Sequence, residues 1–373
     1  MRKTILALAI PAATIMMASA HAANVYNANG SSLDVYGKVE ADMTHAGSTK
    51  NSNKSQVDAK GDLTTSARLG IKGETRVNDN VSVFAKGEWD VSGQNSDGST
   101  FKARKAYLGA DFGKDGKVSF GQQNTPLYTS LTQAIDIFDQ WGMEAQTGIY
   151  GESRQASQAI YSNTFGNLDV QAGYQFRNND GKDIGAMSTT TAGTTTTTDN
   201  EQDNAYSLAG VYHTGIGLNL RAAYARQNFG GLGASAQSGT TLTTGSTDGK
   251  IDTYGLGADY TLNDLYLAFV YLGSKTDNGA AVNSNTSMNS YDLVGAYNIN
   301  QYRLYTGYGL QKTNADGSSS QNSVKSYKLG LEYNITPNAL TWVEYRHNNA
   351  DGTYDGAAGY AKNEVALSGE YDF

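Results

Sequence analysis

The chain ends in Val365-Ala366-Leu367-Ser368-Gly369-Glu370-Tyr371-Asp372-Phe373, a stretch whose alternation decides the fold class. Valine, leucine, glycine, tyrosine and phenylalanine occupy one set of alternate positions, and alanine, serine, glutamate and aspartate occupy the other. Because successive side chains of a strand point to opposite faces, this strand has one apolar and one polar face. A soluble sandwich could end in a similar strand, but the last residues of soluble domains are usually poorly ordered. The terminal Phe373 therefore favours a lipid-facing strand of a transmembrane β-barrel.

The same period of two recurs along the chain. In the segment 168–177, Leu, Val, Ala, Tyr and Phe alternate with Asp, Gln, Gly, Gln and Arg, a pattern that would give a helix no apolar face. Comparable segments lie at 33–42, 63–77, 81–91, 101–112, 117–122, 152–163 and 205–213, and eight more follow Gly217. We predict an all-β fold, an antiparallel transmembrane β-barrel of about sixteen strands, which lies within the range of single-chain bacterial barrels.

Composition agrees with a barrel and excludes other classes. The chain has 43 Gly and 25 Tyr but 3 Pro, and its longest apolar run after the first residues, Leu265 to Leu272, is too short to cross a bilayer as a helix. The negative mean hydropathy does not exclude a membrane protein, because only alternate residues of a barrel strand meet lipid. The absence of cysteine excludes disulfides and thiol chemistry.

The first 22 residues have the features of a secretory signal. Arg2 and Lys3 precede an apolar stretch, and Ala20-His21-Ala22 suits cleavage before Ala23. A retained transmembrane helix fits less well, because the apolar run is short and contains Pro11. We expect residues 1–22 to be removed and 23–373 to form the barrel. Loss of two basic residues leaves 26 against 36 acidic ones, a formal charge of −10 that argues against a nucleic-acid partner.

Two kinds of connection separate the expected strands. Short turns such as Asn78-Asp79-Asn80 alternate with longer polar loops, as a barrel with a periplasmic and an external end requires. The third long connection, Gln123 to Tyr150, differs because it carries apolar and aromatic residues, among them Leu131, Phe138 and Trp141. We expect this third loop to fold inward, pack on the barrel wall and narrow the lumen. The alternative is an external loop that caps the mouth.

Basic residues occupy lumen positions of the early strands. Val39 and Ala67 lie at lipid-facing positions, so their neighbours Lys38 and Arg68 face the lumen. Each base could instead be an ordinary solvated residue or a structural ion pair.

Arg104 and Arg154 follow in the fourth and sixth expected strands, although Lys105 leaves the facing of the fourth strand ambiguous. The third loop supplies Asp136 and Asp139. Acids on the loop opposite bases on the wall would create a transverse field at the narrowing, where screening is incomplete. The acidic balance of the chain predicts a weak preference for cations.

Several segments resemble a known family. Ala23-Asn24-Val25-Tyr26-Asn27, Leu33-Asp34-Val35-Tyr36-Gly37-Lys38, Ala67-Arg68-Leu69-Gly70-Ile71-Lys72-Gly73-Glu74 and Tyr371-Asp372-Phe373 are similar to the general diffusion porins of Gram-negative outer membranes. The resemblance implies a homotrimer of sixteen-stranded barrels, each with its third loop folded into the pore. It implies an outer-membrane channel that needs no cofactor and passes ions and small hydrophilic solutes down their gradients.

The resemblance also suggests roles for single residues. The basic wall of the pore constriction is matched by Lys38, Arg68, Arg104 and Arg154, and the constriction loop is matched by Asp136, with Asp139 and Trp141 close by. Tyr371 and Phe373 match the terminal strand that the barrel-assembly machinery takes up, and lipopolysaccharide is an expected lipid neighbour. Two departures concern the constriction: Asp139-Gln140-Trp141-Gly142-Met143 replaces the family's usual Pro-Glu-Phe-Gly-Gly, and Gln122 and Gln123 stand where a further base is often found.

Three other functions are weighed against a general porin. An enzyme is disfavoured, because His45, His213 and His347 fall at separate places in the expected topology and cannot share a metal or a catalytic triad. A substrate-selective sugar channel would need a ladder of lumen aromatics, for which Tyr128 and Tyr150, with Trp141, are the candidates. An adhesin or receptor would rest on the external loops alone and is compatible with transport.

Overall fold

The computed structural model describes residues 23–47, 49–50, 56–57, 60–93, 101–177, 187–191, 194–198, 200–231, 249–277, 285–317, 319–350 and 363–373. The expected signal peptide, residues 1–22, lies outside these described residues, and so does much of the external loops. The statements below concern the described part of the chain.

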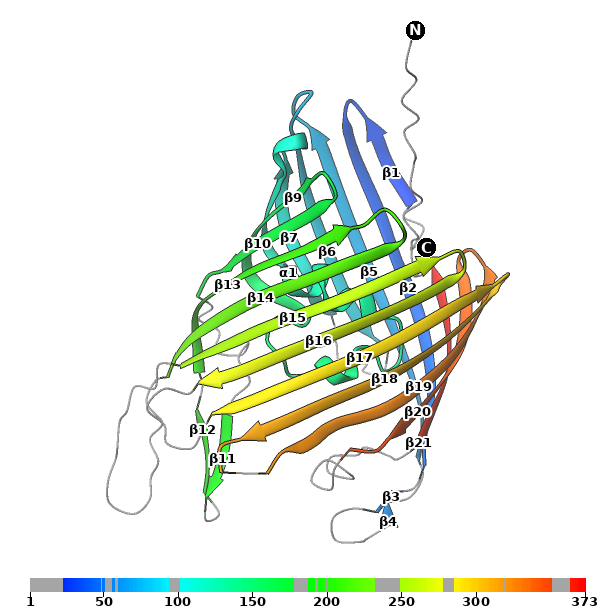
Figure 1. The fold of residues 1–373 in the computed structure, drawn as a ribbon. Helices are drawn as coiled ribbons and strands as arrows, with labels where there is room; N and C mark the ends of the chain where they lie inside the picture. Colours follow the sequence, from blue (N-terminus) through cyan, green and yellow to red (C-terminus); the bar gives the residue numbers. More distant parts are fainter. Residues whose placement is uncertain are drawn as a thin grey trace.

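Seventeen strands form one antiparallel sheet that closes on itself (Figure 1). Sixteen of them build the wall: β2 (Ser31–Ala46), β5 (Lys60–Arg76), β6 (Ser82–Ser92), β7 (Phe101–Asp111), β8 (Lys117–Asn124), β9 (Arg154–Phe165), β10 (Leu168–Gln175), β13 (Asn200–His213), β14 (Leu218–Gly231), β15 (Gly249–Leu262), β16 (Leu265–Asp277), β17 (Thr286–Ile299), β18 (Tyr302–Ala315), β19 (Gln321–Thr336), β20 (Ala339–Asn348) and β21 (Asn363–Asp372). The short pairs β3 (Thr49–Lys50) with β4 (Gln56–Val57), and β11 (Met187–Thr191) with β12 (Thr194–Thr198), form separate sheets. The predicted sixteen-stranded barrel is confirmed.

The barrel closes where its first and last strands meet. One edge of β2 pairs along its length with β5, while its other edge pairs first with the seventeenth strand, β1 (Ala23–Ala28), and then with β21. Gly37 and Phe373 exchange two backbone hydrogen bonds of 3.0 Å at the point where β1 gives way to β21. The two ends of the described chain therefore lie along one strand and leave no open sheet edge.

The alternation of the sequence separates a lipid face from a lumen face. In β21, Val365, Leu367 and Tyr371 are exposed on the outside, whereas Ala366 and Ser368 are buried inside. Exposed tyrosines and leucines line the outside of β13 to β20 in the same way. The apolar exterior is the face that a barrel presents to lipid, and the polar interior can hold water.

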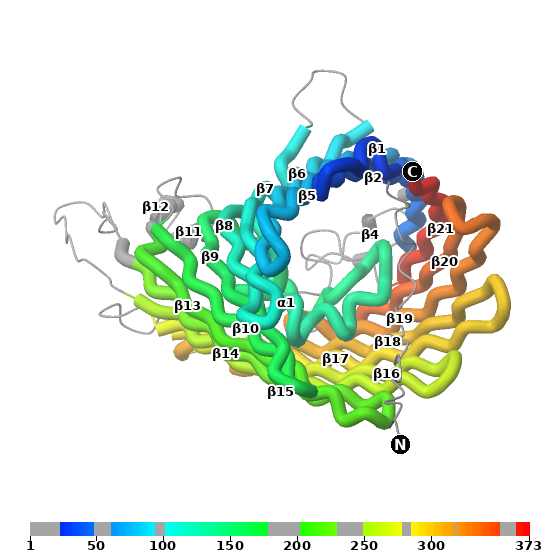
Figure 2. The backbone as a smooth tube through the Cα atoms, turned by 90° about the horizontal axis from the view of Figure 1, so that it is seen from above, coloured from blue at the N-terminus to red at the C-terminus, as the bar shows by residue number. Residues whose placement is uncertain are grey.

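The third loop, residues 125–153, lies inside the closed wall (Figure 2). It begins with α1 (Pro126–Ser130), where Thr125 caps the helix by accepting from the Tyr128 N–H at 3.0 Å and Pro126 occupies the first turn. Two short turns follow, η2 (Thr132–Ile135) and η3 (Glu144–Gln146). No helix among the described residues is long and apolar enough to cross a membrane.

The core of the protein lies between this loop and one side of the barrel. Leu127, Leu131, Ile135 and Phe138 of the loop are nearly or fully buried. They pack on small inward side chains of β13 to β18, namely Ala209, Ala223, Ala225, Ala268, Val270, Leu272, Val294 and Ala296. The predicted inward fold of the loop is confirmed, and the alternative of an external cap is wrong. The loop folds inward because the side of the wall on which it packs is itself apolar.

Candidate channel constriction

A lumen cavity of about 610 Å³ lies between the third loop and the wall formed by the first and last strands. The wall contributes Lys38, Arg68 and Arg104, and the loop contributes Asp136 and Asp139. Five of the residues predicted at the narrowing therefore border one cavity. Arg154 and Trp141 are not part of its lining.

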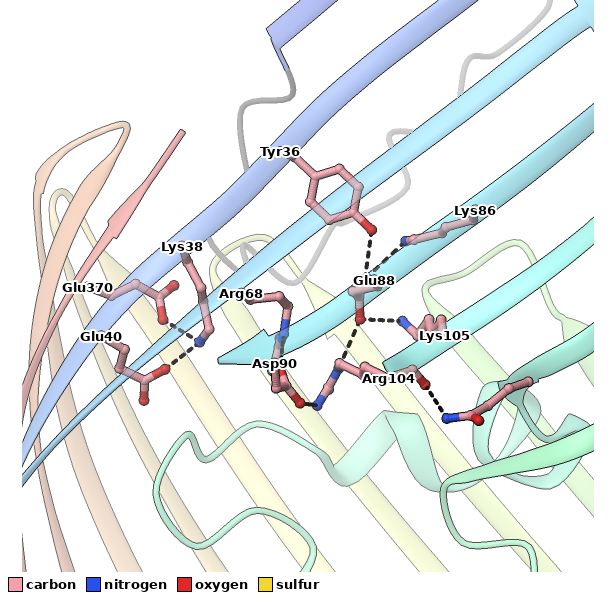
Figure 3. A network of polar contacts seen from close by, with 11 residues as sticks. Tyr36, Lys38, Glu40, Arg68, Lys86, Glu88, Asp90, Arg104, Lys105 and Glu370 are labelled. Atoms are coloured by element: carbon pink, nitrogen blue, oxygen red, sulfur yellow. Dashed lines mark hydrogen bonds and ion pairs between the residues drawn. The ribbon is translucent and has the colours of Figure 1, made fainter. Parts of the chain in front are cut away.

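Two carboxylates organise the basic residues of this wall (Figure 3). Asp90 on β6 binds Arg68 at 2.8 Å and Arg104 at 3.2 Å. Glu88, two residues earlier on the same inward face, is buried and pairs with Arg104 at 2.9 Å. It also contacts two further bases and one hydroxyl: Lys86 at 3.3 Å, Lys105 at 3.5 Å and the Tyr36 hydroxyl at 2.7 Å. Four cations share two carboxylates, so this cluster on β5, β6 and β7 keeps a positive balance.

A β-bulge resolves the ambiguous facing of the fourth predicted strand. Glu88 pairs with Lys105 and Trp89 pairs with Ala103, so Arg104 is the extra residue. The bulge lets both Arg104 and Lys105 reach Glu88 from consecutive positions. A strict alternation cannot predict this, because a regular strand would send one of the two side chains into lipid.

Lys38 is held by carboxylates of the wall itself. Its ammonium lies 2.6 Å from Glu40 on the same strand and 2.5 Å from Glu370 on β21. Sequence reasoning missed both acids. The signal that could have found them is the closure of the barrel, because the register that joins β2 to β21 places Glu40 opposite Glu370.

Arg154 lies where the third loop returns to the wall. It is the first residue of β9, and no carboxylate of the described residues lies within ion-pair distance of it. A second bulge lies on β9, where Ala156 and Ser157 face the single residue Gln122 of β8, and Ser157 has a positive φ there. Glu152, two residues before Arg154, is a loop carboxylate that sequence reasoning missed. Burial, followed by the charge of Asp136, raises the pKa of Glu152 to about 7.

Asp136 is held within the loop. Its carboxylate accepts a hydrogen bond from the Tyr128 hydroxyl at 2.8 Å. Burial raises the pKa of Asp136, while this hydrogen bond and the charges of Lys328, Arg104 and Arg154 act in the opposite direction. Its side chain thus faces cations from both sides of the lumen.

Asp139 and Trp141 occupy the tip of the loop. The Asp139 side chain is exposed to the lumen, while its backbone N–H donates to Glu344 on β20 at 2.9 Å. The Trp141 ring lies 5.4 Å from the guanidinium carbon of Arg346. Trp141 is therefore engaged with the wall.

Buried polar side chains fasten the loop to β17, β18, β19 and β20, and sequence reasoning did not identify them. Glu344 accepts from the N–H groups of Asp139 and Gln140 and from the Tyr305 hydroxyl, and Lys328 donates to the Gly142 carbonyl at 2.5 Å. Gln146 of the loop donates to Asp292 at 2.5 Å. Because these groups are buried and paired, they hold the loop against one side of the lumen.

The sequence profile of the family described as Gram-negative porin matches residues 7–353. The chain belongs to this porin family. Outer membrane protein U of Vibrio parahaemolyticus is 29% identical to this porin over 392 residues, which cover 100% of both chains.

Solved structures show the same fold. The structure of Salmonella typhi OmpF in complex with daunomycin has a TM-score of 0.72 at 20% identity, covering 94% of this porin and 100% of that chain. OmpT of Vibrio cholerae, in a structure described as the trimer form, has a TM-score of 0.68 at 19% identity, covering 92% and 100%. This porin is an outer-membrane β-barrel that forms a channel for the passive diffusion of ions and small hydrophilic solutes.

Most of the residues considered for other functions make hydrogen bonds within the barrel. His213 lies at the short-turn end and contacts Asp169 at 2.8 Å, whereas His45 and His347 lie on β2 and β20 with β21 between them. Of the sugar-ladder candidates, Tyr128 donates to Asp136 and Tyr150 donates to Gln175 at 2.6 Å. These aromatics stabilise the loop and do not form a continuous ladder.

Proposed function

We propose that this porin selects solutes at the cavity between the third loop and the first strands, by size and by charge. The observation that carries the proposal is that side chains of opposite sign border the same cavity. Asp136 and Asp139 lie on the loop side, and Lys38, Arg68 and Arg104 lie on the wall side. In a water-filled lumen of this size, unit charges a few ångströms from a solute act at less than one Debye length.

The proposed roles differ among the basic residues. Arg68 and Arg104 belong to a cluster with an excess of cations, so they attract anions and slow cations. Arg154 has no carboxylate within ion-pair distance in the described chain and adds to the same effect. Lys38 is balanced by two carboxylates and contributes less. Trp141 supports the size limit by holding the loop tip near Arg346. The acids of the loop and of β2 and β21 give the whole lumen a weak preference for cations.

Replacement of Arg68 and Arg104 by alanine tests the charge selection. We expect the double variant to shift the zero-current potential in a potassium chloride gradient toward cations, because Asp90 loses both of its basic partners and Glu88 loses one of three. Arg226→Ala is a matched control, since Arg226 pairs with Asp252 at 2.6 Å on the outer face. A double variant with the wild-type potential would remove these arginines from the constriction.

The proposal includes a homotrimer. OmpT of Vibrio cholerae, whose structure is described as a trimer form, shares this fold. Exposed tyrosines mark the outer face of β13 to β20, whereas the described residues of β2, β5, β6 and β7 carry no exposed tyrosine. Membrane-interface aromatics are expected where a barrel meets lipid. The sector without them is the one that would meet neighbouring subunits.

Two further partners belong to the same proposal. Lipopolysaccharide carries phosphate groups, and exposed Lys275 and Lys312 lie on outward positions near the long-loop end of their strands. The barrel-assembly machinery would take up β21, whose end carries the exposed aromatic rings of Tyr371 and Phe373.

A further inference from the structure

We infer that the lumen holds a second solute site on the short-turn side of the third loop, and that this site takes zwitterions, such as short peptides, which carry both a carboxylate and an ammonium group. The inference rests on the proposed channel being open, because solutes reach the site only along the lumen. It concerns the short-turn side of the third loop, where the lining shares only Arg303 and Glu332 with the constriction cavity, and a selectivity different from the weak preference for cations.

The site is a cavity of about 690 Å³ where β15 to β19 meet their short turns. Inward side chains of these strands line it, including Tyr266, Asn298, Arg303 and Glu332. The Tyr266 hydroxyl donates to the Ala134 carbonyl of the third loop at 2.7 Å, so the loop lies beside the cavity. Arg303 and Glu332 also line the constriction cavity, and a solute leaving the constriction therefore meets them next.

Arg303 is the feature that points to a ligand. Its side chain is 8% exposed, and its contact with Glu332 is 3.4 Å long. The closest carboxylate contact is 2.9 Å or shorter for six other arginines, namely Arg68, Arg76, Arg104, Arg221, Arg226 and Arg346. The Nη2 atom of Arg303 is buried and has no hydrogen-bond partner among the described residues. Because the desolvation of this guanidinium is incompletely offset, a turn of the Arg303 side chain toward an oxyanion in the cavity that it lines would give Nη2 a partner.

The other charges of the cavity favour a cation. Glu332 and Asp264 are its two carboxylates, against the single guanidinium of Arg303. Asn334 donates to Glu332 at 3.1 Å, which leaves part of that carboxylate free for a second donor. A simple anion is repelled by the two acids, and a simple cation leaves Arg303 unsatisfied. A solute with both charges satisfies both, and asparagine side chains on the same surface can pair with a peptide bond.

Alanyl-alanine is a suitable probe, because it is a zwitterion at neutral pH. Its C-terminal amide is a cation and its N-acetyl derivative is an anion, and both are of nearly the same size. In planar bilayers at neutral pH, we expect alanyl-alanine to reduce the open current saturably and at lower concentration than either derivative. Equal or stronger binding of the amide would overturn the inference, since attraction of a cation to the acidic side chains of the lumen would then explain the binding.

Two variants with different consequences separate a binding role from a structural one. Arg303→Gln should weaken alanyl-alanine binding about tenfold, because the carboxylate loses a partner, and should strengthen binding of the cationic amide, because Glu332 is released and a positive charge is removed. Glu332→Gln should strengthen binding of the N-acetyl derivative, because Arg303 is released and a negative charge is removed. Arg226→Gln, on the outer face, should behave as wild type. Unchanged alanyl-alanine binding by Arg303→Gln would overturn the inference.

The site can also be tested without conduction. Saturation-transfer NMR of alanyl-alanine with the detergent-solubilised wild-type barrel should show contact, and Arg303→Gln should reduce it. Absence of contact with the wild type would overturn the inference. Failure of the diffusion function gives a different result, which is no open current in potassium chloride before any dipeptide is added.

Discussion

Glu152 and Arg154 lie where the third loop returns to the wall. The charge of Glu152 depends on pH near neutrality, whereas the charge of Arg154 does not. Arg154 remains charged at neutral pH, because the guanidinium loses its proton only in strong base. Glu152 is half-buried beside the carboxylate of Asp136, and burial is the larger cause that raises its pKa to about 7. Its charge therefore changes near physiological pH.

Lowering the pH should reduce the preference for cations through Glu152. A raised carboxyl pKa means that the folded protein binds this proton more tightly than the unfolded chain, so Glu152 becomes neutral as the pH falls through about 7. The zero-current potential in a salt gradient should shift toward anions between pH 8 and pH 6. Glu152→Gln should show a smaller shift than the wild type, and the remainder belongs to Asp139, whose pKa is raised to about 8 by desolvation and by the charge of Glu344. The same shift in both proteins would assign it to another group.

The residue scale is also where sequence reasoning reached its limit. Lys38, Arg68, Arg104, Asp136 and Asp139 border one cavity, and their role as the pore constriction stays a prediction. Their partners were missed because pairing depends on register and on bulges. Glu88 meets both Arg104 and Lys105 through the bulge at Arg104, and Glu370 meets Lys38 only through closure of the barrel.

At the scale of the element, the third loop is held by packing and by buried hydrogen bonds. Its apolar residues alone allowed the inward fold to be predicted. Its anchors were not predictable, since Glu344 and Lys328 look like ordinary lumen residues of an amphipathic strand. Only the structure brings them to the loop backbone.

Removal of the Glu344 anchor should loosen the loop tip. Glu344→Ala leaves the N–H groups of Asp139 and Gln140 without their acceptor, at a cost of roughly 1–3 kcal/mol for each group that stays buried. We expect the open-channel current noise to rise, and Glu344→Gln, which keeps one acceptor oxygen, to lie between alanine and wild type. Glu74→Ala is a control, because Glu74 accepts from Ser82 at 3.0 Å, away from the loop. Noise unchanged in Glu344→Ala would show that packing alone fixes the loop.

Glycine on the wall makes room for the loop. A Cβ at Gly307 would lie 2.8 Å from the ring of Phe138, which itself packs on Tyr305 at 5.0 Å. Gly307→Val should lower the free energy of unfolding in detergent by about 1–3 kcal/mol, as is usual for an overpacked core. Gly369→Val should have less effect, since the nearest atom to its Cβ is 3.9 Å away. Equal loss in both variants would point to a general cost of changing a strand glycine.

At the scale of the whole molecule, the outer face is divided. The lipid side of β13 to β20 exposes tyrosines among its leucines. The described residues of β2, β5, β6 and β7 expose mainly aliphatic side chains and no tyrosine. Strand count, closure and the inward loop followed from the period of two and from the composition of one connection. The trimer does not follow from them, because an interface between barrels and an interface with lipid are both apolar.

Ala67 and Ala258 provide a matched test of the trimer. Both lie on the outer face, Ala67 on β5 opposite Val39 and Ala258 on β15. Ala67→Trp should abolish or weaken the trimer band in unheated detergent gels, because a large ring is added where subunits are proposed to meet. Ala258→Trp should leave the band intact, since lipid accommodates an apolar ring. A trimer band that survives only in Ala67→Trp would place the interface on the other side of the barrel.

The central claim is that an open, water-filled lumen passes small hydrophilic solutes without a coupled energy source. Single-channel recording of the purified porin in a planar bilayer, in potassium chloride with neutral sugars of increasing size, tests it most directly. We expect the current to rise in steps as single channels insert and remain open. Small sugars should lower this current only by slowing the ions, without saturable block. A silent protein, or saturable block by one sugar alone, would contradict the account.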